Sequence, residues 1–301
     1  MEQTVVEVND LSRSFGPKRA LDGVSFHATA GQVYGLVGAN GAGKTTLLKH
    51  LLGLLRATTG SVRVFGLDPV RDPVGVLSRI GYLSEEPELP EWMRVDELMA
   101  FTQAFHPTWD ASYARELIET FGLDASKKVK ELSKGMRAQA GLVAAVAHRP
   151  ELLILDEPSS GLDAVVRRDI LDAIVRTVTD DGRTVIFSSH LLDEVERMSD
   201  HVTMLHAGRV TLSGALDDVR HGYQRSRVRF AEQFDRPPAL DVALAIEGGG
   251  RLWSVVHNES ADRFQHAVRA LGGEVVESRD ATLEEIFLAR AGRNRQQVEA
   301  A

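Results

Sequence analysis

The sequence contains no cysteine among its 301 residues. This absence excludes a disulfide framework, a zinc site built on thiolates, a thiol nucleophile and an iron–sulfur cluster held by the chain's own side chains. Long apolar runs are missing too, since the most apolar helical stretch, 142–147, is far shorter than the roughly 20 residues that span a bilayer. The N-terminus also lacks the basic and then apolar pattern of a secretory signal. We therefore expect a chain that works in the cytoplasm.

Positive charge is scarce as well. Lys and Arg total 35 against 43 Asp and Glu, so the formal net charge is −8. Because general binding to nucleic acid depends on clustered positive charge, we expect no nucleic-acid partner. What remains, 43% hydrophobic and 26% charged residues, is typical of a globular chain with room for one large domain or two ordinary ones.

Hydrophobic periodicity predicts an α/β domain that carries a helical insertion. Strand and helix patterns alternate up to about residue 80 and again over 152–205, which is typical of a largely parallel sheet covered on both faces. Between about 85 and 150, apolar residues recur at helical spacing. We place this domain at 1–216 and its helical subdomain at about 85–150.

The character of the chain changes after this point, and residues 217–301 predict a small α+β domain. Two of its expected strands, 242–247 and 252–256, are separated by three consecutive glycines at 248–250, which we interpret as a turn. A helical pattern follows at 261–271. The size of this part lies within the usual range for a domain.

A phosphate-binding loop is the most specific motif of the sequence. It has the pattern GxxxxGK[ST] and lies between an expected strand, 33–37, and an expected helix. Glycines let backbone amides converge on phosphate oxygens, the lysine reaches the β and γ phosphates, and the hydroxyl that follows it ligates Mg²⁺. The motif consists of Gly38, Ala39, Asn40, Gly41, Ala42, Gly43, Lys44 and Thr45.

A second element, Leu152–Pro158, is an apolar run that ends in two carboxylates. A strand buried on both faces delivers its last residues to the edge of the sheet where ligands bind, so Asp156 is expected beside the phosphate-binding loop and the Mg²⁺. Glu157 could then orient and deprotonate an attacking water.

With both motifs in place, the sequence resembles the ABC (ATP-binding cassette) ATPases over residues 4 to about 215. Leu132-Ser133-Lys134-Gly135-Met136 resembles their LSGGQ signature, and Ser160-Gly161-Leu162-Asp163 resembles their D-loop. Ser188-Ser189-His190 resembles their switch histidine, and Phe15 matches the aromatic residue that stacks on adenine. Residues 282–287, TLEEIF, resemble the closing motif of bacterial ABC-2-type exporter ATPases.

The resemblance implies a role for each matching residue. Phe15 would stack on the base, and the phosphate-binding loop together with Thr46 would hold the triphosphate. Thr45 and Asp156 would hold Mg²⁺, Glu157 would be the general base, and His190 would bind the γ-phosphate. Ser133, Gly135 and Asp163 would serve ATP bound to the opposite subunit, so the resemblance implies a head-to-tail dimer of two copies.

Two positions depart from the family pattern. The signature carries Lys134 where a glycine is usual and Met136 where a glutamine is usual, while Gly135 is retained. In the Q-loop, Glu85 stands where a glutamine is expected. A carboxylate can also ligate Mg²⁺ directly or through water, but Glu85 could equally be one more member of the solvated acidic run Glu85, Glu86, Glu88 and Glu91.

The resemblance predicts the fold, a P-loop NTPase core with a helical insertion and a small C-terminal domain. It also implies an activity: ATP hydrolysis that drives export through a separate ABC-2-type transmembrane subunit, with the chain peripheral on the inner face of the cell membrane. The alternative is an ABC-type ATPase that acts without a membrane, on nucleic acid, the ribosome or cofactor assembly. A regulator with weak turnover is a third hypothesis.

Overall fold

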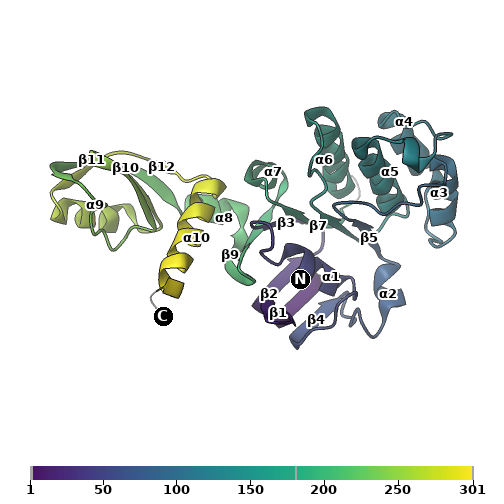
Figure 1. Cartoon of the computed structure of the whole chain (residues 1–301), viewed down its shortest axis with the longest axis horizontal. Coiled ribbons are helices and arrows are strands. Elements are labelled where there is room, and N and C mark those ends of the chain that lie inside the picture. The colour runs from purple at the N-terminus through teal and green to yellow at the C-terminus, as the bar shows by residue number, and fades with distance from the viewer. Residues whose placement is uncertain (1–2, 180–181, 300–301) are drawn as a thin grey trace. The chain divides into compact units, whose positions relative to one another are not determined.

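The computed structural model describes residues 3–179 and 182–299. The chain divides into two compact units, Met1–Leu212 and Ser213–Ala301, and each is described by itself. Among the described residues, no helix combines the length and apolar character that crossing a membrane requires. Figure 1 labels the elements and colours them along the chain, from purple at the N-terminus to yellow at the C-terminus.

Two sheets form the first unit. Antiparallel strands in the order β2-β1-β4 make the smaller one. The larger has the order β5-β6-β7-β3-β8-β9, and its neighbours from β5 to β8 run parallel. The strands are β1 (Thr4–Phe15), β2 (Lys18–Thr29), β3 (Val33–Val37), β4 (Thr59–Val64), β5 (Ile80–Leu83), β6 (Leu152–Asp156), β7 (Thr184–Ser189), β8 (His201–His206) and β9 (Arg209–Ala215).

The parallel strands explain where a site can form. β3, β6 and β7 are buried along their whole length, as continuous apolar runs in a doubly covered sheet are. Because parallel strands end at the same edge, the segments that follow β5, β6, β7 and β3 come together there. These segments carry Glu85, Glu157, His190 and the phosphate-binding loop.

Helices α3, α4 and α5 lie between β5 (Ile80–Leu83) and β6 (Leu152–Asp156) along the chain. α5 packs against β5, and α3 and α4 pack against α5 (Figure 1). Asp110 caps α4, since its side chain accepts hydrogen bonds from the backbone of Ser112 and Tyr113. The helices of the first unit are α1 (Lys44–Leu51), α2 (Pro73–Leu77), α3 (Val95–Gln103), α4 (Ala111–Thr120), the 3-10 turn η1 (Val129–Glu131), α5 (Lys134–Val146), α6 (Ala164–Thr179) and α7 (Leu192–Met198).

The second unit is an antiparallel sheet in the order β11-β10-β12, with α9 packed on it. Its core includes Phe230, Trp253 and Phe264. The elements are α8 (Leu216–His221), β10 (Gln224–Phe234), β11 (Ala245–His257), α9 (Ala261–Ala270), β12 (Gly273–Asp280) and α10 (Leu283–Glu299).

The expected turn at the three glycines is wrong. Residues 248–250 lie inside β11, opposite an irregular stretch of β10 between Arg229 and Phe234. Gly248 and Gly250 have φ values of 143° and 61°, so glycine here allows a bend within one strand instead of a connection between two.

Candidate nucleotide site

The phosphate-binding loop leaves the buried strand β3 and enters α1 at Lys44. Its backbone requires glycine at particular positions. Gly43 has φ 115°, and a Cβ added there would lie 2.7 Å from the carbonyl oxygen of Ala20. A Cβ at Gly38 would lie 2.5 Å from the carbonyl oxygen of Leu205. The glycines therefore serve close packing of the loop against β2 and β8, in addition to chain reversal.

The loop borders a cavity of about 290 Å³. This cavity brings together most of the residues expected to hold a nucleotide, from the first hairpin, the phosphate-binding loop and the ends of β5 and β6. The lining residues are Phe15, Lys18, Ala20, Ala39, Asn40, Gly41, Ala42, Gly43, Lys44, Thr45, Thr46, Glu85 and Glu157. Phe15 is 46% exposed. The Arg13 guanidinium lies over its ring, 4.9 Å from the centroid, so one face of the ring is open to a ligand.

Three charged or polar side chains form a chain of contacts at the cavity. Lys44 Nζ lies 2.9 Å from Glu157 Oε1 and donates to the carbonyl oxygen of Gly38 at 2.5 Å. The other carboxylate oxygen, Oε2, lies 2.7 Å from His190 Nδ1 and also accepts from the His190 backbone at 3.3 Å. Lys44 and Glu157 are both buried. His190 does not line the cavity but reaches it through Glu157.

Burial acts to raise the pKa of Glu157, but the hydrogen bonds and positive charges of Lys44 and His190 outweigh it, and the net shift is downward. The group is therefore a carboxylate at neutral pH, which is the form that accepts a proton. Glu157 also has φ 51°, a left-handed conformation that is uncommon for a residue with a side chain and is frequent at functional sites.

Asp156 ends β6 and is 3% exposed. Ser188 links it to Glu157: the Ser188 hydroxyl donates to Asp156 Oδ1 at 2.6 Å and accepts from the Glu157 backbone at 2.9 Å. Burial and the charge of Asp156 together raise the pKa of Tyr82 to about 12. The described residues include no cluster of three or more metal-binding His, Asp or Glu side chains. A Mg²⁺ with few protein ligands fits this donor set, because that ion is commonly held by one or two carboxylates and the phosphates of its substrate.

Glu85 lies on the wall of the cavity, and its Oε1 accepts a hydrogen bond from the Ser160 hydroxyl at 3.1 Å. Glu85 is exposed, as are Glu86, Glu88 and Glu91 of the same acidic run, so both expectations for this residue remain open. The same carboxylate also lines a wider groove of about 940 Å³, together with Glu86, Glu88 and Glu91. Whether Glu85 ligates Mg²⁺ stays a prediction.

The structure does not bring the signature and D-loop residues to the cavity. Ser133 caps α5, where its hydroxyl accepts from the Met136 backbone at 3.2 Å, and Gly135 is buried in the first turn. Asp163 accepts from the backbones of Val165 and Val166 at the start of α6. All three therefore occupy helix N-termini of this chain away from its own cavity, as expected for residues that act on another copy.

Comparison with known proteins settles the family. Residues 21–160 match the family described as "ABC transporter". The chain is 34% identical to the daunorubicin resistance ATP-binding protein DrrA3 of Streptomyces coeruleorubidus, an alignment that covers 100% of both chains. The chain belongs to the family of ABC transporter ATP-binding proteins. The resemblance drawn from the motifs is thereby confirmed.

Solved structures show the cassette fold over about 70% of the chain. An ATP-binding subunit of an ABC transporter is 32% identical, with a TM-score of 0.67, over 72% of this chain and 92% of that chain. The cassette MJ0796, in a dimeric post-hydrolysis state bound to ADP and phosphate, is 20% identical with a TM-score of 0.63. It covers 70% of this chain and 98% of its own, and shows the fold alone. The expected P-loop NTPase fold is confirmed.

Motif matching in this ABC ATPase missed several residues at the site. Lys18 and Ala20 line the cavity from β2, and Ser188 joins the Asp156 carboxylate to the backbone of Glu157. Lys18 pairs directly with Phe15 across the first hairpin, so the turn between these two residues could have predicted that Lys18 lies near the cavity. Ser188 was part of the motif that ends in His190 but had no role assigned to it, because its contacts depend on the pairing of β6 with β7.

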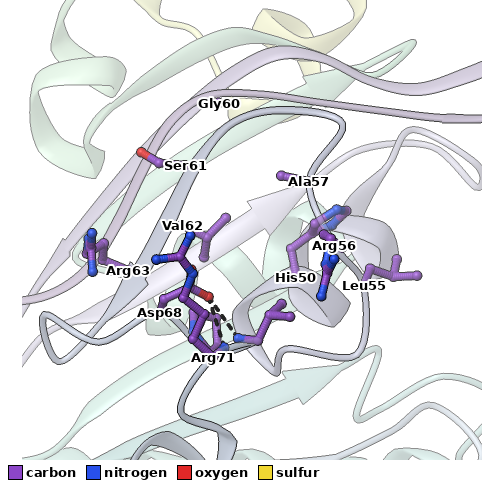
Figure 2. A pocket seen from close by; sticks show the side chains of 12 residues that line it. His50, Leu55, Arg56, Ala57, Gly60, Ser61, Val62, Arg63, Asp68 and Arg71 are labelled. Atoms are coloured by element: carbon purple, nitrogen blue, oxygen red, sulfur yellow. Dashed lines mark hydrogen bonds and ion pairs between the residues drawn. The ribbon is translucent and has the colours of Figure 1, made fainter.

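A further cavity, of about 460 Å³, lies at the opposite end of α1 (Figure 2). Figure 2 shows His50 from α1, Val62 and Arg63 from β4, and Asp68 and Arg71 from the loop that follows. The Asp68 side chain accepts hydrogen bonds from the backbones of Val70 and Arg71. None of the residues expected to bind nucleotide lines this cavity, so it is separate from the ATP site of the cassette.

Proposed function

We propose that this chain is the ATP-binding and ATP-hydrolysing subunit of an ABC transporter that drives export through a separate membrane-spanning subunit. The observation that carries the proposal is the contact chain Lys44–Glu157–His190 at the edge of a cavity lined by the phosphate-binding loop. A buried lysine for phosphate, a carboxylate for a water and a histidine beside that carboxylate are the groups that phosphoryl transfer to water needs.

Each lining residue has a role in this proposal. Phe15 stacks on the base, and 38–46 hold the phosphates by backbone amides, Lys44 and hydroxyls. Lys44 exchanges its contact with Glu157 for a phosphate, which frees the carboxylate to take the proton of the attacking water. His190 then holds the γ-phosphate and orients Glu157 through its Nδ1–H. Thr45 and Asp156, with Glu85 as a third candidate, would hold Mg²⁺, and the ion would supply positive charge to the phosphate oxygens.

A second copy completes the site in this proposal. Ser133, Gly135 and Asp163 lie at helix N-termini that present donors and positive potential, but away from the chain's own cavity. A head-to-tail pair would place them over ATP bound to the partner, and the neighbour MJ0796 is described as dimeric. ATP that binds the closed pair better than the open one shifts the population toward closure.

The transport half of the proposal rests on the relatives and on the wide groove. The name of DrrA3 associates that protein with daunorubicin resistance, and its alignment includes the C-terminal unit of this chain. The 940 Å³ groove lies between the segment after β5 and the start of α5, and Trp92, 69% exposed, lines it. We assign this groove to an ABC-2-type permease subunit, with the chain on the cytoplasmic face of the membrane and without a nucleic-acid partner. Residues 1–216 are the ATPase domain, and 217–301 an accessory domain.

Replacing Glu157 by Gln tests the proposal. The amide keeps the shape of the side chain but cannot accept the proton of water, so kcat should fall by at least about 100-fold while ATP binding persists. Steady-state phosphate release and titration with a fluorescent ATP analogue measure the two quantities. Hydrolysis by the variant at the wild-type rate would remove Glu157 as the base. Co-purification of the chain with a multi-span membrane protein tests the transport half of the proposal. Absence of the chain from cell membranes would contradict that half.

A further inference from the structure

Glu194 is a buried carboxylate in the first turn of α7, and no role has been assigned to it so far. Its side chain is 3% exposed. One oxygen, Oε2, accepts hydrogen bonds from the hydroxyls of Ser159 at 2.8 Å and Ser189 at 3.1 Å. The other oxygen, Oε1, faces Arg167 Nε at 3.7 Å. Because burying a carboxylate is costly unless it is paired, a charge at this place needs all of these partners.

The partners connect Glu194 to both ends of the D-loop, Ser160–Asp163. Ser159 directly precedes this loop and is 2% exposed. Arg167 follows it on α6, and its Nη2 donates to the carbonyl oxygen of Leu162 at 3.3 Å. The D-loop is therefore held between two groups that both meet the same carboxylate.

The third partner connects Glu194 to the switch histidine. The Ser189 hydroxyl accepts from the Leu191 backbone at 3.0 Å and so closes a turn around His190. This hydroxyl has one proton to donate, and Glu194 Oε2 at 3.1 Å is a charged acceptor, whereas the carbonyl oxygen of Leu191 is at 3.4 Å. Because the Ser189 hydroxyl donates its hydrogen bond to Glu194, a lone pair of its oxygen is left to accept from the Leu191 backbone. The turn presents His190 to Glu157.

We propose that Glu194 is a positioning residue that fixes the D-loop and the His190 turn relative to each other, so that the general base and the residues offered to the partner subunit move together. This inference rests on the proposed ATPase function. Glu194 does not line the nucleotide cavity, so its removal affects the geometry of the reacting groups and spares the binding of ATP.

The test compares four single substitutions in the full-length chain. Glu194→Ala should lower kcat about tenfold or more, with the affinity for a fluorescent ATP analogue unchanged within about twofold. Glu194→Gln keeps an acceptor for the two hydroxyls and should recover most of kcat. Ser159→Ala and Ser189→Ala each remove one hydrogen bond to Glu194 with little change in side-chain volume. Each should lower kcat by about threefold to tenfold. The double variant Ser189→Ala/Glu194→Ala should lose less than the product of the two single losses, since the two side chains share one contact.

Asp193→Asn is the matched control, because Asp193 is the neighbouring acid on the same helix turn but is exposed. It should leave kcat unchanged. If wild type hydrolyses ATP and the variants at 159, 189 and 194 all keep kcat within twofold, the inference is overturned. An equal loss in Asp193→Asn, or weakened nucleotide binding in Glu194→Ala, also overturns it. If Glu194→Ala does not fold, the two serine variants decide. A wild-type protein without ATPase activity would instead count against the proposed function.

Discussion

The two units of the chain arrange their charged side chains in opposite ways. In the first unit, a few buried charges converge at the ends of neighbouring parallel strands: Lys44, Asp156, Glu157 and, behind them, Glu194. In the second unit, arginines of β10 form ion pairs along the sheet with acids of β12, and these pairs are exposed. Arg227 lies 3.5 Å from Glu277, and Arg229 lies 3.3 Å from Glu274.

The difference separates buried charges, which we assign to the proposed nucleotide site and its support, from exposed charges on a solvated surface. A buried charge interacts strongly with its neighbours and is costly to leave unpaired, so its removal is felt by every group that meets it. An exposed pair is screened by solvent and contributes little. Substitutions should therefore have effects that decrease from the cavity of the first unit to the sheet of the second.

The largest effect is expected for Lys44→Ala. This change removes the cation proposed to meet the phosphates and leaves Glu157 buried without its lysine partner, 2.9 Å away. Truncating one partner of a buried charge pair costs about 2–5 kcal/mol, and ATP binding should weaken by a similar amount. Calorimetric titration with ATP measures it. Lys49→Ala, on the exposed side of the same helix, is the control and should bind ATP like wild type.

His190→Ala should have the next largest effect, and on a different quantity. The imidazole contacts Glu157, and in the proposed mechanism it holds only the γ-phosphate, whereas the phosphate-binding loop carries most of the binding. We therefore expect kcat to fall about 100-fold while ATP binding changes little. Single-turnover hydrolysis and binding titrations separate the two. A large loss of ATP affinity with an intact rate of hydrolysis would contradict this assignment.

Most of the first unit could be predicted from the sequence, because its signals are local. The phosphate-binding loop needs glycines beside one lysine, and the strand that ends in Asp156 and Glu157 is a continuous apolar run. The order of strands, β5-β6-β7-β3, then brings Glu85, Glu157, His190 and the loop to one edge. The family and the fold followed from these patterns, and the comparisons confirm both.

What the sequence could not predict depends on pairing across long stretches of chain. Ser160 meets Glu85 from 75 residues away, and Ser188 meets Asp156 from 32 residues away. The three glycines were misread because glycine favours turns and strand irregularities alike, and only the pairing of β11 with β10 distinguishes them. Glu194 lacks any local signal, since its burial results from the packing of α7 on β3 and β7.

A third prediction concerns Glu285, the most strongly paired acid of the second unit. Its carboxylate contacts Arg225 Nη1 at 2.5 Å and Arg279 Nη2 at 2.6 Å, and Oε2 accepts from the Thr282 backbone at 3.0 Å. With the Thr282 hydroxyl accepting from the Glu285 backbone, this forms a capping box at the start of α10. Glu285→Gln should destabilise the second unit by about 1.5–3 kcal/mol, as loss of charged hydrogen bonds does. Urea-dependent hydrogen exchange of β10 peptides measures this.

The pH dependence of that stability follows from the same contacts. Burial acts to raise the pKa of Glu285, but the hydrogen bonds of Arg279, Thr282 and Arg225 lower it to about 2 from its ordinary 4.5. The stabilisation is therefore complete above the unfolded-state pKa and is lost as pH falls from about 4.5 towards 2. Glu285→Gln should flatten this part of the pH profile. An unchanged slope in the variant would show that other acids cause it.

The smallest effect is expected for Arg227→Ala, which removes one of the exposed ion pairs between β10 and β12. Both side chains of the pair are more than half exposed, at 53% for Arg227 and 57% for Glu277, and the contact of 3.5 Å is long for a charged pair. Such pairs contribute about 0.2–1 kcal/mol, so the second unit should lose less than about 1 kcal/mol. Glu277 stays solvated after the change and carries no penalty for a missing partner. The same exchange measurement at low and at high salt checks this, since salt screening should remove the small stabilisation that the ion pair contributes. A loss comparable to that of Glu285→Gln would mean that the exposed ion pairs between β10 and β12 act as one network, and the contrast between the two units would then not hold.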